Sequence, residues 1–211
     1  FHTDISKLEQ YERNTKDALS WMKDTETALR EINEALKRTY ELTQDAANGT
    51  KTGEDLKKIR EEVEQIKEHL IQIGNTTYAG RHVFSGYKTD EKLFDENGNY
   101  NIALDKDEIF EYNVGVSERV KVNTLGGKVF GNLDGSYEGN VSEGKKAYLI
   151  QVFDDLSGAL NTNDSDKIQS AITNLQNSQE QILSVNAEVG AKMNRLDLTE
   201  KKLDVQKEGV T

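Results

Sequence analysis

Three histidines are the side chains of this sequence best suited to metal binding or to proton transfer. They are His2, His69 and His82, and the sequence holds no cysteine. His69 lies beside an apolar helical stripe, and His82 lies in a glycine-flanked turn. Neither has a second His, Asp or Glu at a spacing that would complete a metal site. We therefore expect ordinary structural or exposed histidines, with no role as ligands or general bases.

The segment 95–100, Asp-Glu-Asn-Gly-Asn-Tyr, begins like a calcium-binding loop. In an EF-hand the glycine is at the sixth loop position and a bidentate glutamate is at the twelfth. Here Gly98 is at the fourth position and Lys106 at the twelfth. We interpret the segment as a hairpin turn.

The sequence shows none of the motifs that usually mark an enzyme. Absence of cysteine excludes thiol nucleophiles, disulfide scaffolds and cysteine-ligated metals. No phosphate-binding loop, nucleophile elbow or dinucleotide fingerprint occurs. We predict no catalytic residues, no cofactor-binding residues, no metal site and no cofactor, and so a protein that is not an enzyme.

Composition indicates an elongated, acidic protein. The 211 residues carry a formal net charge of −11, and only 35% of them are apolar. Mean hydropathy is −0.76. Nucleic acids and anionic membranes attract clustered Lys and Arg, so neither is an expected partner. No stretch reaches the roughly 20 apolar residues of a membrane span. The low apolar content suits a body with a large surface for its core.

The first 80 residues predict two antiparallel helices. Apolar, Ala and Thr residues recur at steps of three and four over 3–48, which is typical of a coiled-coil seam. Asn48-Gly49 ends this helix, and Thr52 with Asp55 begins a second helix as a capping box. Because the proline-free chain forces no kink, the first helix can extend over about 65–70 Å. The seam residues are Ile5, Leu8, Tyr11, Thr15, Ala18, Met22, Thr25, Leu29, Ile32, Leu36, Thr39, Thr43 and Ala46, followed by Leu56, Ile59, Val63, Ile66, Leu70 and Ile73.

The last 67 residues predict a similar pair of helices, over 145–160 and 168–203, with a polar turn and capping side chains at 161–164. The second carries heptads in which Gln179 and Asn186 occupy seam positions. Polar seam residues can specify register and partner number at some cost in stability.

The middle of the chain changes its period. Eleven of the 16 glycines lie between Gly74 and Gly144, and alternating residues at 100–104 and 110–116 favour half-buried strands. Asn97-Gly98, Gly126-Gly127 and Asp134-Gly135 are hairpin-turn signals. We predict an α+β fold: an elongated antiparallel helical bundle built from both chain ends (1–80 and 145–211), with an inserted small β-rich outer domain (81–144).

Three segments of the sequence, 46–50, 75–86 and 189–196, carry motifs of a known protein family. Residues 46–50 (Ala-Ala-Asn-Gly-Thr) are similar to the end of the long flagellin helix. Residues 189–196, with Asn194-Arg195-Leu196, resemble the C-terminal core helix of the family. The turn 75–86, which contains Gly80-Arg81 and Phe84-Ser85-Gly86, resembles the hook–filament junction class, the third group of hook-associated proteins.

This resemblance implies a structural adapter outside the cell, exported by the flagellar type III pathway without a cleaved signal. Its implied partners are identical subunits in a junction ring, a neighbouring hook-associated protein and flagellin, and an export chaperone is compatible with the family. Full-length members carry further helical residues at both ends, so we expect a core fragment that is a soluble monomer and does not polymerise.

Three alternatives stay open. Filament flagellin belongs to the same superfamily. An unrelated coiled-coil binding module would show similar heptads, but it would not need the turn at 75–86. A cell-wall hydrolase in the unrecognised insert is the enzymatic alternative, although 81–144 shows no acid–base constellation.

Overall fold

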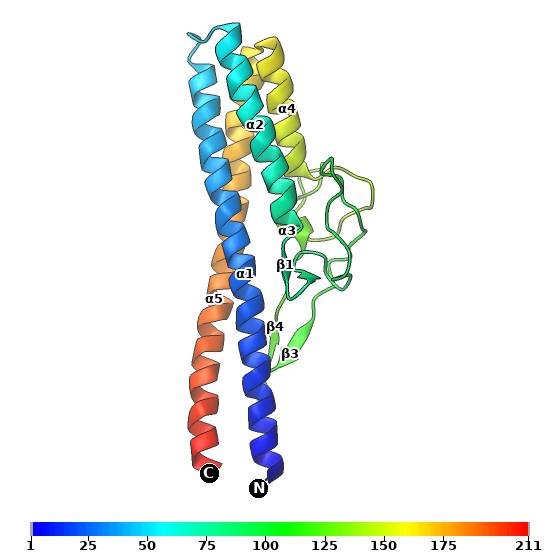
Figure 1. Cartoon of the computed structure of the whole chain (residues 1–211), viewed down its shortest axis with the longest axis vertical. Coiled ribbons are helices and arrows are strands. Elements are labelled where there is room, and N and C mark those ends of the chain that lie inside the picture. Colours follow the sequence, from blue (N-terminus) through cyan, green and yellow to red (C-terminus); the bar gives the residue numbers. More distant parts are fainter. Residues whose placement is uncertain (1, 211) are drawn as a thin grey trace.

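The computed structural model describes residues 2–210, in which two helices of 46 residues run side by side along the molecule (Figure 1). They are α1 (His2–Ala47) and α5 (Ser165–Val210), each about 69 Å long. They are antiparallel, so the two chain ends lie at the same end of the rod. The predicted pairing of the two chain ends is confirmed.

Two shorter helices complete a four-helix bundle at the opposite end. They are α2 (Gly53–Gly74) and α4 (Tyr148–Thr162), and they pack on each other. Because α2 also contacts α1 and α4 also contacts α5, the four helices form a closed ring of neighbours. Over the other half of the rod only α1 and α5 continue (Figure 1). The predicted elongated α+β fold is confirmed, and no helix in the described part of the chain is long and apolar enough to cross a membrane.

Local signals begin and end these helices where the sequence predicts, with small shifts. Thr52 Oγ1 accepts a hydrogen bond from the Asp55 amide at 3.2 Å, and the Asp55 carboxylate accepts one from the Thr52 amide at 3.0 Å. This is the predicted capping box. The helix expected over 145–160 instead spans α4, and Asn163 in the left-handed conformation ends it. Asp164 then caps α5 through the Lys167 amide.

The seam between α1 and α5 is buried but only partly apolar. Leu29, Ile32 and Leu36 are at most 1% exposed. Four threonines share the seam: Thr15, Thr25, Thr39 and Thr43 are buried, and each Oγ1 donates to the carbonyl oxygen four residues earlier. Gln179 Nε2 donates across the seam to Asn33 Oδ1 at 3.0 Å. The helices therefore satisfy most of their buried polar groups within the bundle.

Two lysines clamp one carboxylate between α2 and α4. Lys67 Nζ lies 2.9 Å from Asp154 Oδ1, and Lys146 Nζ contacts Asp154 Oδ2. Burial by itself would raise the pKa of Asp154, but the hydrogen bonds and charges of the two lysines outweigh burial and lower it. The side chain of Asp154 is 23% exposed, so this ion pair is only partly screened by solvent.

The insert between α2 and α4 contains short strands joined by ordered turns. The strands β1 (Thr77–Tyr78) and β2 (Arg81–His82) form one antiparallel hairpin, and β3 (Glu111–Asn113) and β4 (Arg119–Lys121) form another. Single antiparallel bridges join Phe94 to Tyr100 and Leu104 to Val141. The short helix α3 (Gly126–Phe130) completes the insert.

Two local expectations about the insert are wrong. Val116, expected on the buried face of a strand, is 90% exposed, because β3 ends at Asn113 and the chain turns back toward β4. Gly126-Gly127, expected as a hairpin turn, is the first turn of α3. A Cβ on Gly127 would lie 2.3 Å from the Gly139 carbonyl oxygen, so this glycine permits close backbone packing.

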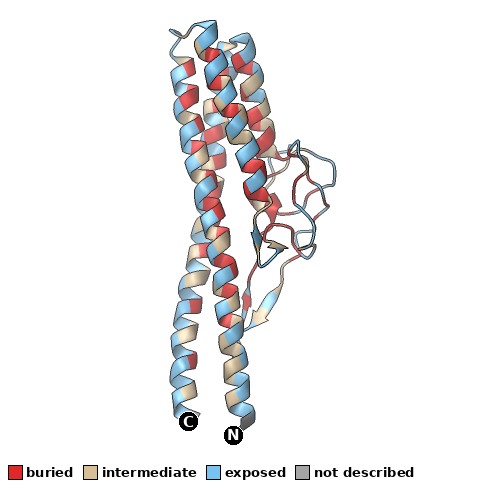
Figure 2. Ribbon diagram, in the orientation of Figure 1, coloured by how far each residue is buried: buried red, intermediate tan, exposed pale blue. Residues whose placement is uncertain are grey.

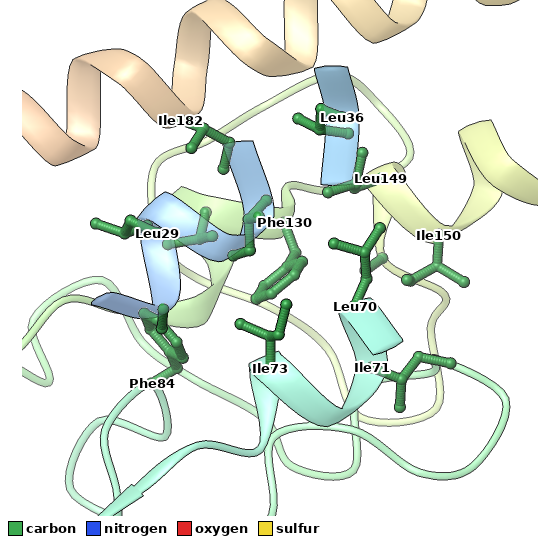
Figure 3. Close-up of a cluster of buried hydrophobic side chains, with 14 of the residues drawn as sticks. Leu29, Leu36, Leu70, Ile71, Ile73, Phe84, Phe130, Leu149, Ile150 and Ile182 are labelled. Atoms are coloured by element: carbon green, nitrogen blue, oxygen red, sulfur yellow. The ribbon is translucent and has the colours of Figure 1, made fainter. Parts of the chain in front are cut away.

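The insert shares its hydrophobic core with the helices. Phe130 of α3 lies among Leu29, Leu70, Leu149 and Ile182, side chains that come from all four bundle helices (Figure 3). Buried residues concentrate along the inner faces of the bundle and under the insert, and they thin out toward the chain ends (Figure 2). The insert is therefore packed against the middle of the rod.

Candidate assembly site

The turn 75–86, which we call the joint turn, connects α2 to the insert. Asn75 caps the end of α2, and its side chain forms two hydrogen bonds with the backbone of Phe94. Its Nδ2 donates to the Phe94 carbonyl oxygen at 3.1 Å, and its Oδ1 accepts from the Phe94 amide at 2.9 Å. One side chain thus ends the helix and holds the insert in place.

A tight hairpin follows directly. Tyr78 pairs with Arg81, and the two residues between them, Ala79 and Gly80, have φ values of 51° and 78°. Two successive positive φ values are what a type I′ hairpin turn requires. The turn directs the side chains of Tyr78 and Arg81 toward α1, where both contact the same residues.

Trp21 of α1 is the residue against which this hairpin packs. Its side chain is fully buried. Tyr78 and Phe110 contact it edge to face with ring centroids at 6.0 and 5.1 Å, and the Arg81 guanidinium lies 4.9 Å from the ring centroid. Aromatic pairs and a cation over an indole each add about 0.5–1.5 kcal/mol beyond simple burial. Trp21 therefore joins α1 to both hairpins of the insert.

Asp17, one turn before Trp21, holds the polar edge of the same contact. Its carboxylate accepts a hydrogen bond from the Tyr78 hydroxyl at 3.1 Å and lies 3.9 Å from the Arg81 guanidinium. Burial, together with a hydrogen bond to Asp17, raises the pKa of Tyr112. Ring contacts, hydrogen bonding and charge therefore hold this cluster together.

The second half of the joint turn enters the shared core. Phe84 is fully buried, and Phe130 contacts both Phe84 and Phe94 edge to face, at 6.1 and 4.8 Å. The Gly126 amide donates to the Phe84 carbonyl oxygen at 2.9 Å. The joint turn is therefore fixed to α1 at one end and to α3 at the other.

Side chains that could contact another protein lie on the outside of this frame. On α5, Leu198 and Val205 are 65% and 68% exposed, and their spacing of seven places them on one helix face. The insert exposes Tyr87, Val116 and Leu133. Single exposed apolar residues are common, but two in one heptad position are typical of a surface that can pack against another helix.

The three histidines and the turn 95–100 were the sequence's candidates for metal binding or proton transfer, and the structure places them as follows. His69 is exposed on α2, His82 Nδ1 lies 3.1 Å from the Asn75 carbonyl oxygen, and the side chain of His2 is outside the described residues. Asp95 Oδ1 accepts hydrogen bonds from the amides of Asn97 and Asn99, and Phe94 pairs with Tyr100 across this turn. The hairpin interpretation of 95–100 is confirmed. In the described chain no three His, Cys, Asp or Glu side chains are grouped as a metal site.

The joint turn was predicted from its resemblance to a known segment, but its contact with Trp21 was not predicted. The lone tryptophan of the sequence was the available signal, because a single large aromatic in a polar helix usually has a specific packing partner. Its partners Tyr78 and Arg81 lie about 60 residues away along the chain, a separation that periodicity does not bridge.

Comparison with known protein families links the chain to bacterial flagella. The N-terminal helical region of bacterial flagellin matches residues 1–89. The flagellar hook-associated protein 3 of Escherichia coli is 28% identical over 188 residues, which cover 82% of this chain and 57% of that protein. Curated flagellins also match, over shorter parts of the chain. The chain thus spans little more than half the length of this hook-associated relative and less of the flagellins.

Two solved structures of flagellar proteins superpose on this chain to different degrees. The flagellar junction protein FlgL from Legionella pneumophila superposes with a TM-score of 0.78 at 17% identity, covering 98% of this chain and 95% of that one. Flagellin from Bacillus cereus gives a TM-score of 0.62 at 20% identity, covering 90% of this chain and 88% of that one. The insert and the rod together therefore follow the hook-associated architecture more closely than that of the filament protein. Residues 1–89 therefore match the N-terminal helical region of bacterial flagellin, and the chain as a whole has the fold of the FlgL structure.

Proposed function

We propose that this chain is part of a structural adapter at the hook–filament junction of the bacterial flagellum. In this role it joins the hook side to the filament and gives flagellin a surface on which to assemble. One observation carries the proposal: nearly the whole chain, insert included, follows the fold of a protein described as a flagellar junction protein. The long rod of α1 and α5 supports a mechanical role.

The proposal includes partners and a location. The adapter would contact identical subunits laterally and, along the flagellar axis, a neighbouring hook-associated protein on one side and flagellin on the other. It would function outside the cell after export without a cleaved signal peptide. We also propose that the rod (1–80 and 145–211) and the outer insert (81–144) are its two domains, with the joint turn fixing the angle between them.

Deletion of the parent gene tests the proposal in cells. We expect cells that still build hooks, lack filaments and release flagellin monomers into the medium, with filaments restored by the gene supplied on a plasmid. Growth of normal filaments on hooks that lack this protein would contradict the junction role.

Localisation separates the junction role from that of a filament flagellin, the second candidate, which the flagellin matches favour. Antibody raised against the insert, carrying gold particles, should label one narrow band where hook meets filament. Labelling along the full filament would assign the chain to the filament instead. A strain that lacks flagellin is the matched control, because the junction band should persist there while filament labelling disappears.

A further inference from the structure

Four cations gather where α5, α3 and β4 meet, and we call them the cationic patch: Lys121, Lys128, Lys192 and Arg195. The whole chain has 38 acidic and 27 basic residues, so a local excess of positive charge is unusual here. Lys128 Nζ lies 4.0 Å from Glu188. Within the described residues, Lys121, Lys192 and Arg195 form no ion pair within the same distance, although Glu111 is the cross-strand neighbour of Lys121.

Contacts on both sides place the patch on one face of α5. Lys128 of α3 meets Glu188, and Gln181 Nε2 donates to the Lys128 carbonyl oxygen at 2.9 Å. Further along α5, Lys202 Nζ lies 2.6 Å from Glu118, next to β4. Residues 188, 192, 195, 199 and 202 follow steps of three and four, so Lys192 and Arg195 lie between these two contacts on the same helix face.

This arrangement is electrostatically unfavourable in the isolated chain. Burial lowers the pKa of Lys192, Glu188 opposes this effect, and the charges of Lys128, Lys121 and Arg195 lower the pKa further. Like charges held together and partly desolvated cost free energy unless an anion compensates them. Charges that are left unpaired in this way are typical of functional surfaces.

The same chain carries an acidic segment, of opposite charge to the patch, on the insert. Segment 90–108 contains seven acidic and two basic residues. Five of the acids are exposed and form no ion pair in the described part of the chain, and we call them the acidic rim: Asp90, Glu91, Glu96, Asp105 and Asp107. Of the other two acids, Asp95 is half-buried, and Glu108 is buried and paired with Lys88 at 3.1 Å.

We propose that the cationic patch of one subunit binds the acidic rim of a second copy of this chain. Two different surfaces meet in such a contact, and this heterologous geometry is the one that generates rings or helical arrays of identical subunits. The inference rests on the proposed function, because it names the surface for the lateral contact in the junction. Exposed ion pairs are individually weak, so the contact would be transient in dilute solution and populated in the assembly.

Zero-length carbodiimide cross-linking tests this contact on the purified chain. Equal amounts of ¹⁵N-labelled and unlabelled chain are mixed at about 10 mM salt, where screening is weak because the Debye length is about 30 Å. Mass spectrometry of the dimer should find amide links between Lys192, Lys121 or Lys128 of one isotopic form and Asp or Glu of 90–107 of the other. The mixed label distinguishes these links from links within one chain.

Charge reversal provides the decisive comparison. The double variant Lys192→Glu with Arg195→Glu should lower the links made by Lys121 and Lys128 about tenfold, since two lysines and two glutamates then cancel and the patch no longer attracts the rim. On the rim, the double variant Glu91→Lys with Glu96→Lys should lower the cross-links by a similar factor. Within the described residues the native side chains of Glu91 and Glu96 form no hydrogen bond or ion pair. A mixture of the two variants should restore the links to within about twofold of the native chain, because the native patch of the rim variant can then meet the native rim of the patch variant.

The control variant is Lys57→Glu with Lys58→Glu, which changes the net charge equally at exposed positions of α2. It should leave the links unchanged. Loss of links in this control, absence of rescue in the mixture, or links from the patch only to an added acidic protein such as flagellin would each overturn the proposal. Because the gene-deletion phenotype does not depend on this assay, failure of the contact would leave the junction role standing.

Discussion

At the scale of single residues, the joint turn shows how a few side chains connect a helical rod to an irregular insert. Asn75 ends α2 and holds Phe94, and Arg81 lies over Trp21. Each of these contacts links segments that are distant in sequence. A substitution here should therefore change how the insert sits on the rod, while the helices themselves persist.

Ala79 is the position where the joint turn should be easiest to improve. Its φ of 51° is in the left-handed region, which costs a residue with a Cβ about 1 kcal/mol. Asn tolerates this region and Asn-Gly is the favoured pair in type I′ turns, so we expect Ala79→Asn to raise the free energy of unfolding by about 0.5–1 kcal/mol. Urea unfolding followed by circular dichroism measures this. Ala103→Asn, at an exposed position without positive φ, should change stability by less than about 0.5 kcal/mol, and an equal gain in both variants would contradict the turn argument.

At the scale of elements, the long helices could be predicted from the sequence and the strands only in part. Heptads are local, and they repeat often enough in α1 and α5 to specify a buried seam without knowledge of the partner. The strands of the insert have two or three residues each, so their extent depends on tertiary contacts. Val116 shows the limit: Val114 is buried as expected, but the chain turns after Asn113 and leaves Val116 exposed.

The candidate site, like the strands, could be predicted only in part. The joint turn was found because its residues resemble a known segment. Its contacts with Trp21 join residues about 60 positions apart, and the ion pair of Lys67 with Asp154 joins residues 87 positions apart on two helices. No periodic pattern encodes such pairs, because each depends on how the elements pack.

Asp154 gives the pairing of α2 and α4 a defined pH dependence. Its pKa is lower in the folded chain than the usual value of an aspartate, about 3.9, because two lysines contact its carboxylate. The unfolded state therefore binds the proton more tightly, so this contribution to stability is present above pH 4 and is lost as the pH falls through the folded pKa. We expect Asp154→Asn to lower the free energy of unfolding by about 1–2 kcal/mol at pH 7, since it removes hydrogen bonds to a charged group.

Urea unfolding at pH 7, 5 and 3 measures this effect. The difference between Asp154→Asn and the native chain should shrink as the pH approaches 3, because protonation removes the same charge from the native side chain. Asp155→Asn, a change at the exposed neighbouring carboxylate, should alter stability little at any of these pH values. A difference that stays constant with pH would show that the ion pair with the lysines is not its cause.

At the scale of the whole molecule, the rod has two halves of different thickness. In the four-helix half, residues such as Leu36 and Leu70 are buried between neighbours on several sides. In the two-helix half, α1 has no buried residue from 3 to 14, and Leu203 is the only buried residue of α5 after Leu196 within the described chain (Figure 2). Surface ion pairs such as Lys202 with Glu118 add little there.

This difference predicts that the rod opens from its thin half. Amides of 3–12 and 204–209 should exchange hydrogen with opening free energies below about 2 kcal/mol, and those of 28–42 should approach the global value of about 5–15 kcal/mol. Hydrogen exchange followed by mass spectrometry measures both. Leu203→Ala should increase exchange only in the thin half, whereas Leu36→Ala should increase it throughout, because the four-helix half carries the global stability. Uniform protection along α1, or a global effect of Leu203→Ala, would show that the two halves unfold as one unit. Local opening would expose the seam of the thin half, while the cationic patch and the joint turn stay packed. Contacts with neighbouring subunits would therefore stabilise the thin half more than the four-helix half.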